Sequence, residues 1–326
     1  MDIVFGYYFL NDFFIELIRR LAVFFEPSHG LFIGYLLSSL IIALLFYSFE
    51  FKAEKPFFVI KKIISSHRLM SRSTRDDVVF YFVDKVLFGF IYTAIIPISY
   101  LFKEYVHSAL LFISFIQLDI SLSFFLSLIL TFGAIVVFDF AVFIEHLLSH
   151  KIRFLWEFHK IHHIAENLTP FTAYRTHPIN QMTFIFIVSF FSGLYSGIVS
   201  YIFKNQDVFI VFAGQNIFMF ILLMFGLNLQ HSMVFLKYPQ FIRSVLVSPA
   251  YHQLHHSSAT KHHDINYAFI FSFWDKLFKT QIMPGENEGL AFGVTGEKYS
   301  SYAGVLKMYI TPFRRVAKRM RKKKRE

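Results

Sequence analysis

Histidines at helical spacing are the residues of this sequence whose types and positions could do chemistry. The pattern histidine, two residues, then two histidines occurs twice, and a pair of histidines four residues apart precedes it. These eight residues are His146, His150, His159, His162, His163, His252, His255 and His256. Positions i, i+3 and i+4 share one helix face, so each copy is expected to direct its imidazoles toward a single point. Neutral imidazole is a common ligand for iron, zinc and copper, so the pattern predicts a metal site.

The number of candidate ligands points to two metal ions. Zinc normally takes about four ligands and iron at most about six, so eight nitrogens exceed the need of one ion. Zinc could support hydrolysis, but catalytic zinc usually keeps about three protein ligands, and iron fits a histidine-rich site beside lipid better. We therefore expect two non-haem iron ions that activate O2 for attack on an unactivated C–H bond, which side chains alone cannot achieve.

Composition places this site in a membrane protein. Hydrophobic residues make up 55% of the 326 residues, and charged residues make up only 17%. The sequence has no cysteine, which excludes thiolate zinc sites and iron–sulfur clusters held by this sequence. The net charge is +10, but nine basic residues lie within 314–326, so we interpret that segment as a tail at anionic lipids and expect no nucleic-acid partner.

The expected fold is an all-α integral membrane protein with about four to five transmembrane helices and a cytosolic helical cap that holds the di-metal site. Its parts are an N-terminal interfacial helix in 1–30, transmembrane helices and a basic cytosolic loop in 31–145, a catalytic histidine-rich region in 146–297, and a basic tail in 298–326. The expected spans are 31–49, 86–102, 123–144, 182–203 and 208–229, with 109–118 interfacial or re-entrant.

The expected topology brings the histidines together. The last two spans form a transmembrane hairpin at 182–229, which returns the chain to the side it left, so both histidine clusters face one compartment. The basic loop at 50–84 assigns that side to the cytoplasm by the positive-inside rule. Ser248 followed by Pro249 predicts a helix start just before the second cluster. The last thirteen residues are expected to be disordered.

The motifs also carry a family resemblance. The clusters at 146–150, 159–163 and 252–256, followed by Asp264, Asn266, Tyr267, Trp274 and Asp275, resemble the fatty acid hydroxylase superfamily, also called the sterol desaturase family. A second segment is most similar to bacterial members and to alkylglycerol monooxygenases; it comprises His162, His163, Leu168, Thr169, Pro170, Thr172, Ala173, Arg175, His177 and Pro178. The resemblance covers about residues 135–280. It implies a helical membrane protein with a non-haem di-iron site that uses O2 and external electrons.

Carried over by position, the resemblance makes the eight clustered histidines metal ligands and adds His231. Further candidates for ligands or supporting residues are His177, Asp139, Asn266, His262, His263 and Asp264, although the family pattern does not require histidine at 262 or 263. Asp139 lies two helical turns before His146 and could orient that ligand. Three positions depart from the family pattern, namely Leu147, Ala268 and Lys279. None of them removes a ligand, but they leave the substrate open.

The function expected from these features is hydroxylation of a lipid, either fatty acyl, alkyl or sterol-like. A lipid desaturase on the same scaffold is the alternative, because it would use the same ligands. A zinc transporter or sensor is more remote, since a transporter places its ionisable ligands near the membrane midplane and these clusters lie at span ends. A metal-free structural protein would leave the twelve histidines of 146–263 without explanation.

The expected partners are a membrane lipid, anionic lipids at the C-terminal tail, and an external electron donor. A ferredoxin or a b-type cytochrome with its reductase would serve, because the sequence has no cysteine cluster and no glycine-rich dinucleotide fingerprint. We expect the active site on the cytoplasmic side of a bacterial inner membrane, with the endoplasmic reticulum as the alternative.

Overall fold

The computed structural model describes residues 18, 22–50, 70–285 and 289–323. The longer helices are α2 (Ile33–Glu50), α5 (Arg72–Ile95), α6 (Ile98–Phe112), α7 (Phe124–Lys151), α9 (Pro178–Ile202) and α14 (Val305–Lys323). The shorter ones are α8 (Arg153–His163), α10 (Ile217–Met224), α11 (Gln240–Arg243), α12 (Pro249–His255) and α13 (Phe273–Phe278). Four 3₁₀ turns and one two-stranded hairpin complete the described elements: η1 (Thr172–Tyr174), η2 (Leu227–His231), η3 (Thr260–His262), η4 (Tyr299–Ser301), β1 (Val211–Phe212) and β2 (Gln215–Asn216).

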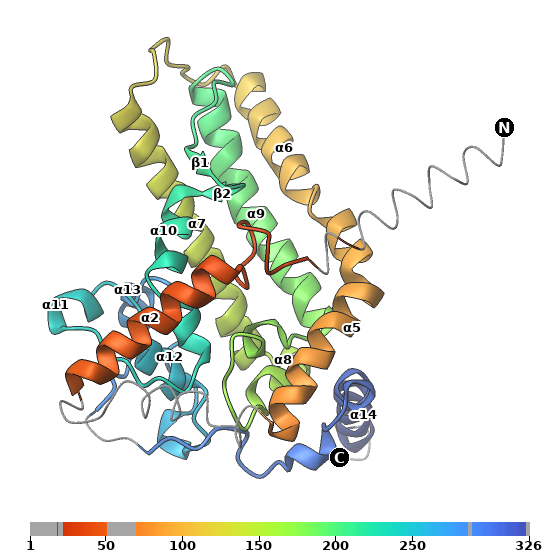
Figure 1. Ribbon diagram of the computed structural model, residues 1–326. Helices are drawn as coiled ribbons and strands as arrows, with labels where there is room; N and C mark the ends of the chain where they lie inside the picture. Colours follow the sequence, from red (N-terminus) through yellow and green to blue (C-terminus); the bar gives the residue numbers. More distant parts are fainter. Residues whose placement is uncertain (1–17, 19–21, 51–69, 286–288, 324–326) are drawn as a thin grey trace.

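Three helical units in the described part of the chain are long and apolar enough to cross a membrane. They are Arg72–Phe112, which joins α5 to α6, Phe124–Lys151 and Pro178–Ile202. They run roughly side by side from the top to the bottom of Figure 1. The expected all-α membrane protein with a histidine-rich site is confirmed. The expected number of spans was about four to five; the described residues contain these three candidates and one shorter apolar helix, Ile33–Phe49.

The expected span at 208–229 is wrong. The chain there forms the short hairpin of β1 and β2, the eight-residue helix α10 and the 3₁₀ turn η2. Gly214 and Gly226 both have positive φ, at 77° and 88°, and such backbone breaks a helix into short pieces. The transmembrane hairpin at 182–229 therefore has one long helix, α9, and an irregular return that ends at His231.

The segment at 31–49 also differs from the expected span. It forms the apolar helix α2, but α2 lies obliquely across the other long helices in Figure 1. Its buried residues Tyr35 and Ala43 pack against α10 and η2, through Leu223, Leu227 and Leu229. The expected interfacial helix at 1–30 and most of the basic loop at 50–84 fall outside the described residues, and the described end of that loop belongs to α5, which begins at Arg72.

Helices α6 and α9 pack closely because two glycines of α9 face α6. A Cβ added at Gly193 would lie 2.7 Å from the Ser99 carbonyl oxygen, and one added at Gly197 would lie 2.7 Å from the Lys103 carbonyl oxygen. Small residues permit such approach of two helices in a membrane. Helix α6 continues to Phe112, so the expected interfacial segment at 109–118 is the helix end and the exposed chain after it.

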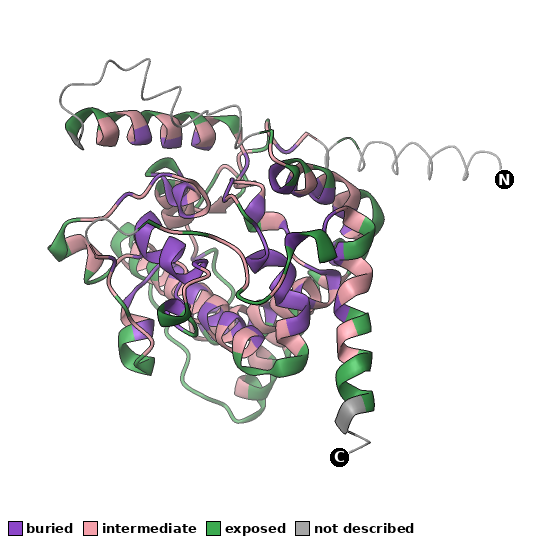
Figure 2. Cartoon of the chain, turned by 90° about the horizontal axis from the view of Figure 1, so that it is seen from below, coloured by how far each residue is buried: buried purple, intermediate pink, exposed green. Residues whose placement is uncertain are grey.

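The lower end of the molecule is a helical cap built on the ends of α5, α7 and α9. It contains α8, α12, α13 and α14, and Figure 2 looks onto it from below, with buried residues in its interior. Ser248 caps α12 by accepting a hydrogen bond from the Tyr251 amide, and Pro249 is its first residue, so that prediction is confirmed. The tail, expected to be disordered, is helical up to Lys323 in α14.

Candidate metal centre

Nine histidines lie together in the cap, and their side-chain nitrogens form two groups. Within each group, the potential ligand atoms lie within 4.8 Å of one another. The first group is His146, His150, His159, His163 and His255, and the second is His162, His231, His252 and His256. Each group therefore combines side chains from both histidine regions, and the nine residues are those singled out from the sequence.

The sequence led us to expect that each copy of the three-histidine pattern would point to a single place. Instead, each copy is divided between the two groups. In α8, His159 and His163 face the first group while His162 faces the second. His252 of α12 and His256, which caps its C-terminal end, belong to the second group, and His255 belongs to the first. Neighbouring positions on an α-helix are rotated by about 100°, so the i+3 and i+4 histidines diverge. This divergence lets one short helix serve two adjacent sites.

The distances between nitrogens within the groups match those between ligands of one ion. His163 Nε2 lies 3.1 Å from the Nε2 atoms of both His150 and His159. In the second group, His252 Nε2 lies 3.1 Å from His231 Nε2 and 3.2 Å from His256 Nε2. Metal–nitrogen bonds of about 2.1 Å place two ligands of one ion about 3.0–3.4 Å apart, depending on the angle. The donor set and its spacing thus fit metal ions.

Hydrogen bonds at Nδ1 orient four of these rings. The Nδ1 atoms of His146, His162 and His255 lie 2.8, 3.0 and 2.7 Å from the carbonyl oxygens of Tyr267, Thr172 and Ile265, respectively. The fourth, His159 Nδ1, lies 2.9 Å from Asn180 Oδ1. Because an oxygen of this kind only accepts, Nδ1 carries the proton and Nε2 keeps its lone pair.

The free lone pairs are buried. His146 Nε2 and His255 Nε2 are buried atoms without a hydrogen-bond partner, so a cation would satisfy them. Burial and then the nearby His146 lower the pKa of both His159 and His231 to about 3. Burial, followed by the effect of neighbouring histidines, holds the pKa of His252 well below its usual value. The rings are therefore neutral at physiological pH, as metal ligands must be.

A tight loop at 264–268 supplies two of the orienting carbonyls. Asn266, with φ of 56°, turns its side chain away from the histidines and makes three hydrogen bonds, to the Tyr251 carbonyl and to the carbonyl and amide of Ile282. The flanking carbonyls of residues 265 and 267 then face His255 and His146. Asn266 thus supports the site indirectly, through the backbone.

Two buried aspartates anchor the chain that follows this loop. Asp139 accepts hydrogen bonds from the amides of Ile270 and Phe271 and from Trp274 Nε1. Its expected role, direct orientation of His146, is not what the structure shows, because the Tyr267 carbonyl fills that role. Asp275 accepts from the amides of Tyr267 and Ala268 and so holds the same loop.

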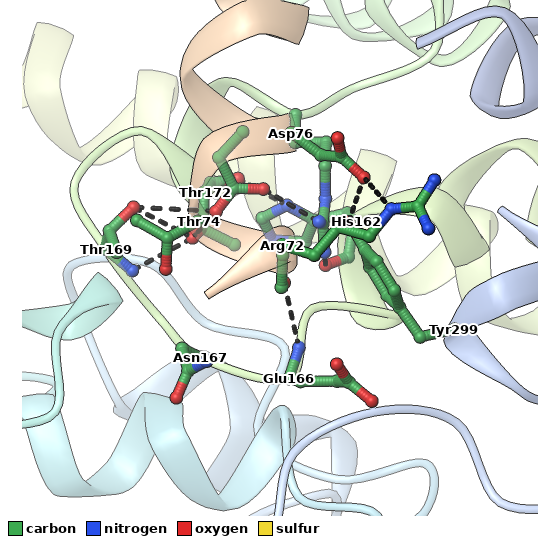
Figure 3. A network of polar contacts seen from close by, with 12 residues as sticks. Arg72, Thr74, Asp76, His162, Glu166, Asn167, Thr169, Thr172 and Tyr299 are labelled. Carbon is green, nitrogen blue, oxygen red and sulfur yellow. Dashed lines mark hydrogen bonds and ion pairs between the residues drawn. The ribbon is translucent and has the colours of Figure 1, made fainter. Parts of the chain in front are cut away.

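A second support comes from α5. The Thr172 carbonyl that bonds to His162 belongs to the loop between α8 and α9 (Figure 3). Asp77 of α5 accepts a hydrogen bond from the Thr172 hydroxyl at 2.6 Å and pairs with Arg175 at 2.7 Å. Asp77 and Arg175 are both fully buried. The ion pair therefore fixes the loop that orients His162.

The other residues suggested from the sequence lie outside the two groups. His177 caps α9 by accepting from the Ile179 amide, and its Nε2 lies 3.1 Å from the Tyr309 carbonyl. His262 is buried in η3, and the exposed His263 lies 3.2 Å from the Thr295 hydroxyl. Asp264 pairs with Lys151 and accepts from the Tyr267 hydroxyl.

Sequence reasoning missed the side chains that orient His159. Asn180 accepts from His159 through Oδ1, while its Nδ2 donates to Glu145 Oε1 at 2.6 Å and to Ser149 Oγ at 3.0 Å. Ser149 also donates to Glu145, at 2.7 Å. Glu145 and Ser149 each precede a histidine of α7. The signal that could have found this network was Glu145, an acidic side chain in a helix that is mostly apolar.

A cavity of about 430 Å³ adjoins both groups. Its lining includes His146 and His159 of the first group and His162, His231 and His252 of the second. Much of the wall is apolar, and polar side chains of α5 line another part. Its size is in the range of small-molecule sites, so an amphiphile can lie against both groups at once.

The fold and the site define a helical membrane protein with a buried, histidine-rich centre suited to two metal ions. Comparison with protein families agrees: residues 131–280 match the fatty acid hydroxylase family. This segment contains all nine histidines. The chain thus carries a segment, residues 131–280, that matches the fatty acid hydroxylase family, and this match supports the resemblance that the sequence motifs indicated.

The chain is also similar to a human alkylglycerol monooxygenase. The two are 27% identical over 165 residues, which is 50% of this chain and 33% of the human protein. The similar region therefore spans about a third of that relative. No solved structure matches this chain.

Proposed function

We propose that this protein is a membrane-bound hydroxylase that uses two iron ions, O2 and electrons from a separate donor to oxidise a C–H bond of a lipid. The observation that carries this proposal is the pair of histidine groups beside a single cavity. The match of residues 131–280 to the fatty acid hydroxylase family and the similarity to an alkylglycerol monooxygenase support the lipid class. The overall balance is RH + O2 + two electrons + two protons, giving ROH + H2O.

Different residues would bind the metal ions, orient their ligands and bind the substrate. The first group would hold one ion and the second group the other, and bound iron supplies oxygen-activating redox chemistry that side chains lack. The backbone carbonyls of Thr172, Ile265 and Tyr267, together with Asn180, keep the Nε2 lone pairs of four ligands turned inward. The apolar cavity wall, including Phe138 and Phe184, would bind the hydrocarbon part of the substrate and exclude water.

Composition and charge support an external electron donor and a metal centre on the cytoplasmic side. A ferredoxin or a b-type cytochrome with its reductase would supply electrons, because the 326 residues contain no cysteine for an iron–sulfur cluster. The basic helix α14 lies at the same end as the histidines, and the positive-inside rule supports the proposal that this end faces the cytoplasm. A bacterial inner membrane is the proposed location.

Labelled oxygen tests the reaction. Cells expressing the wild type, His255→Ala or His263→Ala would be grown under ¹⁸O2, and their total lipids compared by mass spectrometry. We expect a lipid with a labelled hydroxyl group in the wild type and His263→Ala, because His263 lies outside both groups, and none in His255→Ala. A new double bond without label would identify a desaturase instead. No lipid difference, with zinc transport dependent on His255, would reject the oxygenase proposal.

A further inference from the structure

The C-terminal helix α14 has one face that holds it to the cap. Met308 is fully buried in a cluster with Phe80, Ile161 and Tyr302, which belong to α5, α8 and the chain before α14. Tyr309 donates a hydrogen bond to Asp84 of α5 at 3.1 Å. These contacts fix the orientation of the helix, so its opposite side is a defined outer surface.

The same inner face is tied to the helix that carries three of the nine histidines. Arg319 pairs with Glu157 of α8 at 2.7 Å, and Arg315 pairs with Glu297. Lys160 of α8 lies between the two acids, 2.9 Å from Glu157 and 3.3 Å from Glu297. Glu157 is fully buried and lies two residues before His159, so this ion pair connects α14 to α8 close to a candidate ligand.

The outer face of α14 has an apolar stripe beside a basic one. Leu306, Phe313 and Met320 recur every seven residues, and their exposed fractions are 71%, 51% and 63%. At about 100° per residue, the exposed Arg314, Lys318 and Arg321 form a parallel stripe roughly 80–140° around the helix from the centre of the apolar one. Exposed apolar residues next to basic ones are typical of a helix that lies in a membrane interface.

The position of α14 agrees with such an interface. The helix is seen end-on in Figure 1 and along its length in Figure 2, so its axis is roughly perpendicular to the long helices and parallel to a membrane that they cross. It packs beside Phe80, Asp84 and Phe88 of α5. The unit Arg72–Phe112 has 41 residues, or about 62 Å, whereas a hydrocarbon core is about 30 Å thick, so its polar first turns extend beyond the bilayer.

We propose that α14 docks on the surface of the membrane that the protein spans and binds anionic lipid headgroups there. Arg314, Lys318 and Arg321 contact the phosphates, while Leu306, Phe313 and Met320 insert among the upper acyl chains. An acidic soluble protein would pair with the basic stripe but would leave the apolar stripe in water, which is why a lipid surface fits better. The proposal is independent of the oxygenase chemistry.

Site-directed spin labelling tests the depth of α14. The sequence has no cysteine, so Leu306→Cys, Met320→Cys and the control Ser300→Cys can each carry one nitroxide. The full-length protein would be placed in nanodiscs of phosphatidylcholine, with or without phosphatidylglycerol. We expect the ratio of accessibility to O2 over a nickel chelate to rise severalfold at Leu306 and Met320 when phosphatidylglycerol is present, and to stay low at Ser300, which is exposed just before the helix.

Two triple variants separate charge from apolar contact. R314E/K318E/R321E should abolish the effect of phosphatidylglycerol on the labels, and the charge-preserving R314K/K318R/R321K should retain it. Labels that remain in water in both lipids would overturn the proposal. Equal insertion in both lipids, unchanged by charge reversal, would reject anionic lipid as the partner. Shielding of the labels that requires a soluble protein fraction would also reject it.

Discussion

Replacement of Asn180 by leucine should weaken one of the two metal sites and leave the other intact. Asn180 provides the acceptor for His159 Nδ1 at 2.9 Å, and Glu145 and Ser149 fix its amide in that orientation. Without the acceptor, the Nδ1 proton is buried without a partner, or it moves to Nε2 and blocks the lone pair. Because His159 belongs only to the first group, only that site should change.

The size of the effect follows from one lost hydrogen bond behind a metal ligand. Loss of such a partner typically lowers metal affinity about 10- to 100-fold. This factor corresponds to about 1.4–2.8 kcal/mol, which agrees with the roughly 1–3 kcal/mol for an unsatisfied buried donor. Competition between the metal-free protein and a chromophoric chelator for Co²⁺ would measure the affinity of each site for the ion. The wild type should show two tight sites, and Asn180→Leu one tight and one weaker site.

The matched control is Gln181→Leu, the next residue of α9. Gln181 also lines the cavity, but its side-chain oxygen accepts a hydrogen bond from the Thr176 hydroxyl and not from a histidine. Its replacement should leave both affinities within about twofold of the wild type, since the change touches no ligand. Equal affinities in wild type and Asn180→Leu, or equal weakening of both sites, would refute the proposed orientation of His159.

Three further changes test the supports of the site, each by thermal unfolding of the metal-free protein in detergent. Asn266→Ala removes three hydrogen bonds and should lower the free energy of unfolding by about 2–4 kcal/mol. An unchanged midpoint of unfolding would show that the loop at 264–268 does not depend on this side chain. Asp77→Asn should cost about 3–5 kcal/mol by leaving Arg175 buried without its counter-charge, and Asp77→Leu with Arg175→Met should recover much of it. Burial lowers the pKa of His177 to about 4. Above pH 6.5 the ring is neutral in both states, so its protonation does not affect the free energy of unfolding. As pH falls from 6.5 to about 4, the unfolded chain gains a proton that the folded one does not. Stability should therefore fall over that window, and less so in His177→Asn, whose side chain can also cap α9.

Eight of the nine histidines could be predicted from the sequence because metal ligation demands a few residue types at fixed helical spacing, whereas His231 was added by the family resemblance. The pattern of His252, His255 and His256 after Ser248 and Pro249 specifies a short capped helix, and the structure has it. The division of each pattern between two groups was not predicted. It depends on how α8 and α12 face each other, which a local spacing does not encode.

The return of the chain after α9 shows a second limit. Residues 208–229 are apolar enough for a span, but Gly214 and Gly226 adopt left-handed backbone and break the segment. Both clusters still meet, since His231 Nε2 lies 3.2 Å from His162 Nε2 of the first cluster and 3.1 Å from His252 Nε2 of the second. Likewise, the roles of Asp139 and Asn180 arise from contacts across 131 and 21 positions of sequence, which no periodicity reveals.

The most direct test of the two-ion centre is the iron content of the purified protein. Iron per chain would be measured at saturation for the wild type, for His252→Ala/His256→Ala and for His150→Ala/His163→Ala. We predict two iron ions in the wild type and one in each double variant, because each variant removes two ligands from one group only. A wild-type protein that saturates at one ion or fewer, or a double variant that retains two, would contradict the two-group centre.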